Sequence, residues 1–199
     1  MLTRCVLRLA AAGAIVVALT PATATAQTAV PQAIEVPAGY SLFFSAGAVG
    51  NQNYICLPAG NSVGWQFVAP QATLFDAAPH RQQLTTHFLS ANPKEDGLPR
   101  PTWQHSMDSS RVWGRASVTS KDPNFVDADA IPWLLVEVVG AKRGPGGGSF
   151  LVGTAYIQRV NTSGGLAPST GCSTSADIGK LALVPYTADY LFYAADQVW

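Results

Sequence analysis

The residue types best suited to chemistry gather in one part of the chain, between His87 and Ser110. Trp103 follows two prolines there and is flanked by polar residues. The face of an indole ring packs on the apolar face of a sugar, while nearby amide, imidazole and carboxylate groups bind the hydroxyls. We therefore predict a site for a small molecule or a glycan, formed by His87, Trp103, Gln104, His105, Asp108 and Ser110.

The same residues allow a catalytic interpretation. His87, Asp108 and Ser110 are the residue types of a general base, an orienting carboxylate and a nucleophile. A hydrolase that uses His87 and Asp108 is therefore a second hypothesis. A buried histidine bonded to the backbone would explain His87 without any reaction, so we expect binding rather than catalysis and predict no catalytic residue.

The three histidines are also candidate metal ligands. His80, His87 and His105 lack the H-x-H and H-x3-H spacings that are typical of metal sites. We predict no metal site and no other cofactor.

Arg159 is a cation at the end of an otherwise apolar segment. A partly buried guanidinium pairs well with a carboxylate, and Glu137 lies in the neighbouring apolar segment. We expect these two residues to form an ion pair with a structural role.

The N-terminus has the pattern of a secretory signal peptide. Arg4 and Arg8 precede or adjoin an apolar run over residues 9–19 that is too short to span a bilayer, and Ala24-Thr25-Ala26 forms a cleavage site. We predict a signal peptide over residues 1–26 and a single β-rich domain over residues 27–199, exported to the periplasm or the extracellular space. A buried N-terminal helix or a membrane anchor is the alternative.

Export makes a disulfide available. Cys5 lies in the leader, and the pair that remains, Cys56 and Cys172, favours a disulfide in an exported protein; two separately buried thiols are the alternative. Two of the twelve Lys and Arg residues also lie in the leader, which leaves a slight excess of Asp and Glu. We therefore expect neither a nucleic-acid partner nor, after removal of the leader, a membrane span.

The chemistry-bearing residues must be positioned by strands. Apolar, β-branched runs over residues 131–140 and 150–160 flank a glycine-rich loop and predict a hairpin. Other short runs, such as 40–49 and 54–57 with a turn at 50–53, are separated by Gly/Pro or Gly/Asn clusters. No segment has a helical period of useful length. We predict an all-β fold, either a single-domain antiparallel β-sandwich or a flattened β-barrel, with long loops.

Three segments resemble a family of secreted proteins catalogued as domain of unknown function 3455: Pro101–Ser110 (PTWQHSMDSS), Ile131–Val139 (IPWLLVEVV) and Tyr156–Cys172 (YIQRVNTSGGLAPSTGC). The resemblance covers nearly the whole mature chain in the same order. It implies an exported, predominantly β domain and brings no established activity.

The chain departs from the family pattern in two places. Ser90–Arg100 resembles an insertion, and Asp108-Ser109-Ser110 stands where the family tends to have Asp-Gly-Ser. Some fungal relatives carry a malate dehydrogenase label. This sequence does not support that label, because the glycines at 144–148 lie between two predicted strands rather than between a strand and a helix.

A third hypothesis is a structural or cell-envelope protein that makes only protein contacts. It predicts an exposed apolar patch or edge strand. Ligand binding instead requires an open cleft at Trp103, and hydrolysis requires His87 within hydrogen-bond reach of a carboxylate and a nucleophile or water. The identity of the ligand and the oligomeric state stay open at this point.

Overall fold

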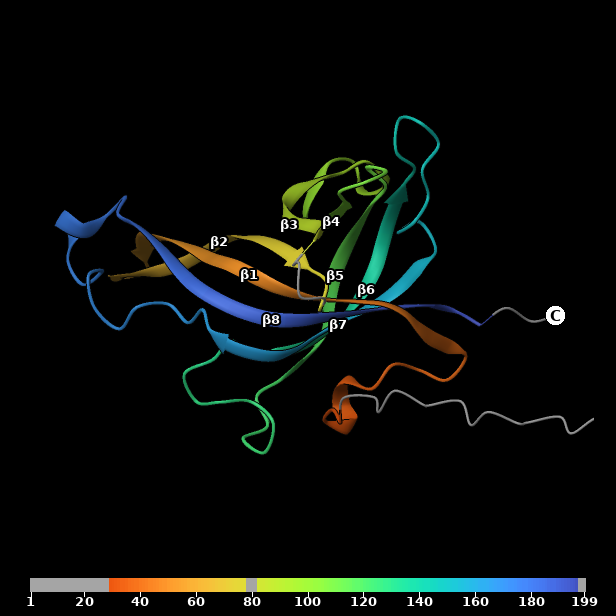
Figure 1. Cartoon of the computed structure of the whole chain (residues 1–199). Helices are drawn as coiled ribbons and strands as arrows, with labels where there is room; N and C mark the ends of the chain where they lie inside the picture. The colour runs from red at the N-terminus through yellow and green to blue at the C-terminus, as the bar shows by residue number, and fades with distance from the viewer. Residues whose placement is uncertain (1–28, 78–81, 197–199) are drawn as a thin grey trace, which may run out of the picture.

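Eight antiparallel strands follow one another around a sheet, and the last pairs with the first to close a barrel (Figure 1). The computed structural model describes residues 29–77 and 82–196, so the predicted signal peptide lies outside the described residues. The strands are β1 (Tyr40–Ala59), β2 (Ser62–Phe75), β3 (Gln83–Asn92), β4 (Leu98–His105), β5 (Arg111–Ser120), β6 (Trp133–Lys142), β7 (Thr154–Gly164) and β8 (Leu181–Ala195). Short 3-10 helices lie at η1 (Gln32–Ile34), η2 (Pro93–Glu95) and η3 (Ser175–Asp177). Within these described ranges, no helix has the length and apolar character needed to cross a membrane.

This architecture confirms the predicted all-β fold in its barrel form. The predicted central hairpin is present as β6 and β7, which pair from Leu134 opposite Arg159 to Glu137 opposite Tyr156. The predicted turn at residues 50–53 is wrong, because β1 is one continuous strand of 20 residues. Its middle pairs with β2 on one side and β8 on the other. The neighbouring strands thus form hydrogen bonds with the backbone groups on both sides of β1. These bonds outweigh the weak strand propensity of Gly and Asn.

Gly50 lies in this stretch for a packing reason. A Cβ atom at this position would collide with the backbone of Gln71 and Ala72 on β2. A glycine inside a strand often marks such a close approach of another backbone. The residue that suggested a turn in the sequence therefore marks a tight contact between β1 and β2.

The main apolar core lies inside the barrel. Tyr186, Ala188, Tyr190 and Phe192 of β8 all belong to it, as expected from the two-residue period of a strand. Trp103 of β4 is 1% exposed and packs edge-on against two of these rings, with centroids 5.7 Å from Tyr190 and 6.4 Å from Phe192. The aromatic residues of β4 and β8 thus meet across the interior.

A second apolar cluster lies outside the barrel, over β6, β7 and β8. It includes Ile34 of η1, Trp133 of β6 and Tyr193 of β8. Gln158 of β7 ties η1 to the barrel wall within this cluster, because its Nε2 donates to the Ile34 carbonyl at 2.7 Å and its Oε1 accepts from the Tyr193 hydroxyl at 2.7 Å. The N-terminal segment around η1 therefore covers one side of the barrel.

The loop between β6 and β7, residues 143–153, closes one end of the barrel. Leu151 is fully buried in the inner core. The ring of Phe150 stacks on His105 at the end of β4, with centroids 4.3 Å apart. The loop therefore acts as a plug for the inner core.

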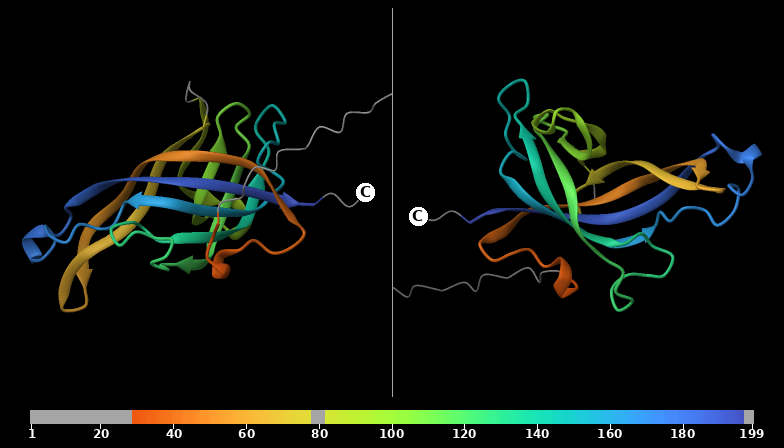
Figure 2. Two further views of the ribbon diagram at one scale, coloured as in Figure 1. Left: turned by 60° about the horizontal axis from the view of Figure 1, so that its bottom comes forward. Right: turned by 180° about the vertical axis from the view of Figure 1, so that it is seen from behind.

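The β3–β4 hairpin leaves the barrel wall before it ends. The ladder between β2 and β3 stops where Ala72 lies opposite His87, and β4 pairs with β5 only over Thr102–Gln104. The hairpin itself continues to the pair Asn92–Leu98, and its outer part curls out of the line of the wall and towards β6 (Figures 1 and 2). A gap in the hydrogen-bonded wall results between β2 and β5.

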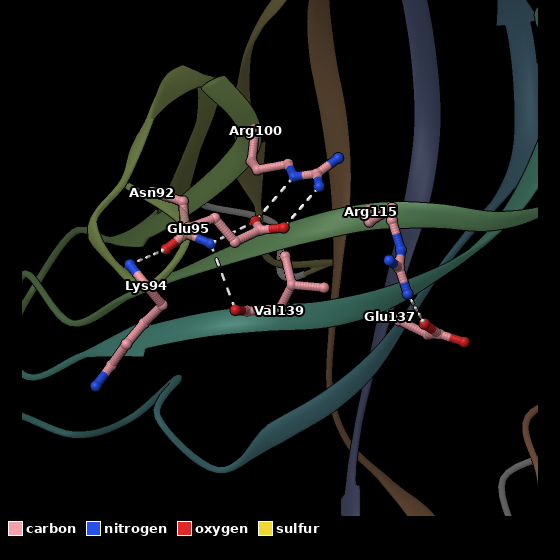
Figure 3. A network of polar contacts seen from close by, with 7 residues as sticks. All are labelled: Asn92, Lys94, Glu95, Arg100, Arg115, Glu137 and Val139. Carbon is pink, nitrogen blue, oxygen red and sulfur yellow. Dashed lines mark hydrogen bonds and ion pairs between the residues drawn. The ribbon is translucent and has the colours of Figure 1, made fainter. Parts of the chain in front are cut away.

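The curled part of the hairpin is held against β6 by polar contacts (Figure 3). Glu95 and Arg100 form a bidentate ion pair, with an Nη2–Oε1 distance of 2.6 Å and an Nε–Oε2 distance of 2.9 Å. Asn92 donates to the same carboxylate at 2.7 Å and to the Val139 carbonyl at 3.4 Å. The hydrogen bonds from Arg100 and then Asn92 lower the pKa of Glu95 to about 2. The segment that resembles an insertion is thus an ordered hairpin tip.

Cys56 and Cys172 form the predicted disulfide, with Cα atoms 5.5 Å apart. The bond ties the end of β1 to the long loop 165–180, at the end of the barrel opposite the plug. Backbone hydrogen bonds join the same two parts, because the Cys56 amide donates to the Lys180 carbonyl and the Gly179 amide donates to the Cys56 carbonyl, each at 2.9 Å. The disulfide therefore anchors this loop to the sheet.

Candidate functional site

A cavity of about 300 Å³ lies inside the barrel, beside the gap left by the β3–β4 hairpin. Its walls are mostly apolar and include Pro70 of β2, Pro101 of β4, Ala116 of β5 and Val136 of β6. Small-molecule sites commonly have volumes of about 300–1,000 Å³ and are lined mainly by apolar and aromatic side chains. The size and lining of this cavity therefore suit a small ligand.

His87 and Trp103 form one wall of the cavity. Their rings stack with centroids 4.3 Å apart and an angle of 13° between the planes. The Nδ1 atom of His87 lies 3.0 Å from the carbonyl oxygen of Thr102, and because a carbonyl can only accept, Nδ1 carries the proton. Burial lowers the pKa of His87 to about 3. The imidazole is thus neutral near pH 7, and its Nε2 is the unprotonated nitrogen.

Arg159 contributes the one positive charge among the described residues that line the cavity. Its Nε and Nη2 atoms donate to the Pro132 carbonyl at 3.2 and 2.7 Å. The expected ion pair with Glu137 is wrong, since Glu137 accepts from Arg115 at 2.8 Å. None of the ion pairs found in residues 29–77 and 82–196 includes Arg159.

Two buried donors of the cavity wall have no hydrogen-bond acceptor among the described residues. They are the indole Nε1 of Trp103 and the amide Nε2 of Gln52, whose residues are 1% and 3% exposed. A buried polar group without a partner costs roughly 1–3 kcal/mol, and most such groups in proteins are paired. An acceptor placed in the cavity would satisfy these donors.

Two tyrosines, Tyr54 and Tyr190, complete the polar lining, and Tyr186 lies behind Tyr190. The hydroxyls of Tyr186 and Tyr190 lie 3.3 Å apart, and Tyr54 donates to the Gly165 carbonyl at 2.6 Å. Burial raises the pKa of all three phenols, while the positive charge of Arg159 opposes this shift. All three are therefore neutral near pH 7.

Three other predicted site residues gather in a different place, at the turn between β4 and β5. The Oδ1 atom of Asp108 lies 2.9 Å from His105 Nδ1 and accepts from the Ser110 hydroxyl at 2.7 Å. Its Oδ2 atom accepts from the Phe150 amide at 2.9 Å. The Ser110 oxygen accepts in turn from the Leu151 amide at 3.1 Å. The cluster thus binds the plug loop to the turn.

Both carboxylate oxygens of Asp108 take part in hydrogen bonds at this turn. Burial opposes its ionisation, but the Phe150 amide and then the hydroxyl and amide of Ser110 lower its pKa well below the usual range. A catalytic serine would have to donate its proton to a histidine, whereas Ser110 and His105 both contact the carboxylate. The arrangement is that of a structural latch, and we call His105, Asp108 and Ser110 the latch cluster below.

Gln104 lies in neither group. It lines a separate surface hollow together with Arg111, Lys142 and Arg143. The structure therefore brings His87 and Trp103 together inside the barrel, His105, Asp108 and Ser110 together at the plug, and Gln104 to a third location.

One serine has the Gly-x-Ser-x-Gly spacing of a hydrolase elbow and is absent from the sequence-based candidates. It is Ser62, within Gly60–Gly64 (GNSVG). Such an elbow requires a sharp turn from a strand into a helix. Ser62 instead begins β2 directly after a strand-to-strand turn, and its hydroxyl donates to the Ala59 carbonyl at 2.9 Å. The motif is here a hairpin turn.

Most of the cavity wall was not among the site residues predicted from the sequence. Gln52, Tyr54, Arg159 and Tyr190 line it but lie far from one another in the sequence. The signal that could have found two of them is the alternation of side chains along a strand, because Arg159 and Tyr190 are direct partners between β7 and β8 and must face the same side of the sheet. Without the strand pairing, it could not be known that this side is the inside of a barrel.

No cluster of three or more His, Cys, Asp or Glu side chains suited to a metal ion occurs in the part of the chain that the structure describes. His80 lies outside that part. The two cysteines within it are joined in the disulfide.

The sequence model of one family, described as protein of unknown function (DUF3455), matches residues 37–194. The match includes all the residues of the cavity wall and of the latch cluster. The chain has no match among curated proteins or among solved structures.

Proposed function

The chain belongs to the DUF3455 family of proteins of unknown function, and we propose that it is an exported, non-enzymatic protein that binds a small aromatic or apolar molecule inside its barrel. The observation that carries the proposal is the cavity of about 300 Å³ beside the stacked pair His87–Trp103. A flat aromatic wall in an apolar cavity favours a ligand with a flat or apolar body.

Export is supported by the disulfide. Cys56 and Cys172 are bonded, and disulfides persist mainly in oxidising compartments outside the cytosol. The predicted signal peptide over residues 1–26 agrees with this compartment. We accordingly assign the protein to the periplasm or the extracellular space.

The chemistry of the cavity wall favours binding over hydrolysis. His87 is neutral, yet its protonated nitrogen is committed to the Thr102 carbonyl. No Asp or Glu lines the cavity within the described residues. Asp108, the predicted partner of His87, is engaged by the plug loop instead. A general base with an orienting carboxylate is therefore not assembled around His87.

The same wall favours a small molecule over a glycan. Trp103 is almost completely buried rather than presented on the surface, and the cavity has few hydrogen-bonding groups for the many hydroxyls of a sugar chain. We therefore narrow the predicted ligand class to small molecules with an aromatic or apolar body.

The direct test is titration of the exported protein with N-phenyl-1-naphthylamine, a neutral dye that becomes fluorescent in apolar sites. We expect saturable binding of one dye per chain and a higher melting temperature. Ala116→Phe places a ring at the cavity wall and should weaken binding about tenfold or more, which corresponds to roughly 1.4 kcal/mol. Ala91→Phe, at an exposed position of the hairpin tip, is the matched control and should bind like the wild type. Equal binding by both variants, or binding that does not saturate, would overturn the proposal.

A further inference from the structure

We infer that the ligand of this cavity carries a carboxylate that pairs with Arg159, so that the preferred ligand class is a small aromatic acid. The inference rests on the proposed function, because it names the chemistry of the molecule bound in the same cavity. It is carried by the position of the guanidinium, by the absence of a carboxylate from the described cavity wall and by the orphaned donors beside it.

Arg159 reaches the cavity from the middle of β7. It lies opposite Leu134 on β6 and opposite Tyr190 on β8, and both of these partners line the cavity with it. Side chains of directly paired residues lie on the same face of the sheet. The guanidinium is thus fixed on the inner face of the barrel.

The guanidinium has donors to spare. Two of its nitrogen atoms donate to a single acceptor, the Pro132 carbonyl. An Arg side chain has five N–H donors in a planar fork, which matches the two oxygens of a carboxylate. The Pro132 carbonyl therefore orients the fork without saturating it.

The described part of the cavity wall has no other charge to balance Arg159. His87 is neutral, and the described wall contains no Asp or Glu. The positive charge of Arg159 acts to lower the pKa values of four nearby groups, those of His87, Tyr54, Tyr186 and Tyr190. Partly buried charges are costly unless they are paired, so an anion in the cavity would be stabilised by a group that is already in place.

The uncharged polar groups point to the same class of ligand. The unpaired atoms Trp103 Nε1 and Gln52 Nε2 are both donors, and every polar hydrogen of the Arg159 guanidinium is a donor as well. A wall with this excess of donors suits a ligand rich in acceptors and disfavours an ammonium group. The volume of about 300 Å³ suits a single-ring acid better than a long-chain fatty acid or an oligosaccharide.

Three probes of nearly equal shape separate charge from shape: 3-phenylpropionate, its neutral amide and the cationic 3-phenylpropylamine. We expect calorimetry on the exported wild-type protein to show that the carboxylate binds at least about tenfold more tightly than the amide, as one charge-assisted hydrogen bond would provide. The amine should bind more weakly than the amide. Arg159→Gln should abolish the preference for the carboxylate and leave the affinity for the amide within about threefold.

Two further variants complete the test. Arg115→Gln removes an exposed cation that pairs with Glu137 on the outside of the barrel, and it should keep the wild-type preference. Arg159→Lys keeps the charge but loses the fork, so we expect an intermediate preference, and it serves as the test if Arg159→Gln does not fold. Equal affinity of the wild type for carboxylate and amide, or an unchanged preference in Arg159→Gln or in Arg159→Lys, would overturn this inference while the cavity remains a binding site. Failure of all three probes and of the neutral dye to bind the wild type would overturn the proposed function itself.

Discussion

His87 of β3 lies directly opposite Trp103 of β4, and their rings stack with centroids 4.3 Å apart. This pair sits where the barrel wall changes. The ladder from β3 to β2 ends at His87, and the ladder from β4 to β5 ends one residue before Trp103, at Thr102. The stacked rings therefore stand at the edge of the gap, where they close the inner core on one side and form the cavity wall on the other.

The first prediction concerns the acid sensitivity of this pair. Burial lowers the pKa of His87 from 6.5 to about 3, so the unfolded chain binds a proton below pH 6.5 that the folded chain does not bind. The folded state should therefore lose stability as the pH falls from 6.5 towards 3, by about 1.4 kcal/mol per pH unit at most. His87→Phe retains a ring but cannot titrate.

Urea unfolding at pH 7.5 and pH 4.5 measures this effect. The loss of unfolding free energy between the two pH values should be about 2–3 kcal/mol smaller in His87→Phe than in the wild type. Both proteins share all other titrating groups, so each serves as the control for the other. An identical loss in both would mean that His87 takes up a proton in the folded state.

The second prediction concerns the latch cluster. Asp108→Asn keeps the shape of the side chain but removes the charge that accepts hydrogen bonds from Phe150 and Ser110. We expect a loss of about 1–3 kcal/mol of unfolding free energy at pH 7, with faster hydrogen exchange in the loop 143–153. Asp127→Asn, at an exposed position, should change neither quantity.

The pH dependence of the same variant gives a check on the mechanism. The folded-state pKa of Asp108 lies below its usual value of 3.8, so its contribution is complete above pH 3.8 and is lost as the pH falls further towards the folded-state pKa. The stability difference between the wild type and Asp108→Asn should thus be constant above about pH 5 and shrink below pH 3.8. A difference that stays constant down to pH 2.5 would show that the charge of Asp108 does not hold the plug loop.

Arg159 illustrates how much of the site the sequence can predict. Its neighbouring strand and its partly buried environment followed from the pattern, but its partner did not. Arg159 pairs with Leu134, and Glu137 is three residues further along β6. Residues separated by an odd number of positions face opposite sides of a sheet. Glu137 therefore points outward to Arg115, while Arg159 points inward, and only the strand register decides this.

His87 and Asp108 also show that the sequence alone does not predict which side chains meet, here for residues further apart in the chain. The fold class, the central hairpin and the disulfide followed from local patterns, because apolar alternation and the number of cysteines are properties of short segments or of composition. Whether His87 and Asp108 meet depends instead on where β4 ends. The β4–β5 turn places Asp108 at the plugged end of the barrel. The β3–β4 hairpin leaves the wall and so creates the cavity beside His87, which no local sequence pattern predicts.

The third prediction concerns that hairpin. The carboxylate of Glu95 binds both Arg100 and Asn92, and the pKa of Glu95 is lowered to about 2. Glu95→Gln should loosen the tip, which raises the hydrogen-exchange rates of residues 90–100 at pH 7. Glu137→Gln, which breaks the exposed pair with Arg115 on the outside of the barrel (Figure 3), is the matched control and should leave these rates unchanged. Equal rates in the wild type and Glu95→Gln would show that the ion pair does not hold the tip in place.

The last prediction concerns the disulfide and the loop that it anchors. Cys56 and Cys172 are 116 residues apart in the sequence, and closing a loop of this size stabilises the folded state by about 4–5 kcal/mol at most, chiefly by restricting the unfolded chain. The double variant Cys56→Ser/Cys172→Ser should therefore unfold at a clearly lower urea concentration than the oxidised wild type. Reductant should lower the midpoint of the wild type towards that of the variant and leave the variant unchanged. Two backbone hydrogen bonds still join the loop to β1 at Cys56, so we expect the reduced protein to keep its barrel and to bind the neutral dye at low urea concentration. A wild-type midpoint that does not respond to reductant, although two thiols become titratable, would show that the bond constrains the unfolded chain far less than its loop length implies.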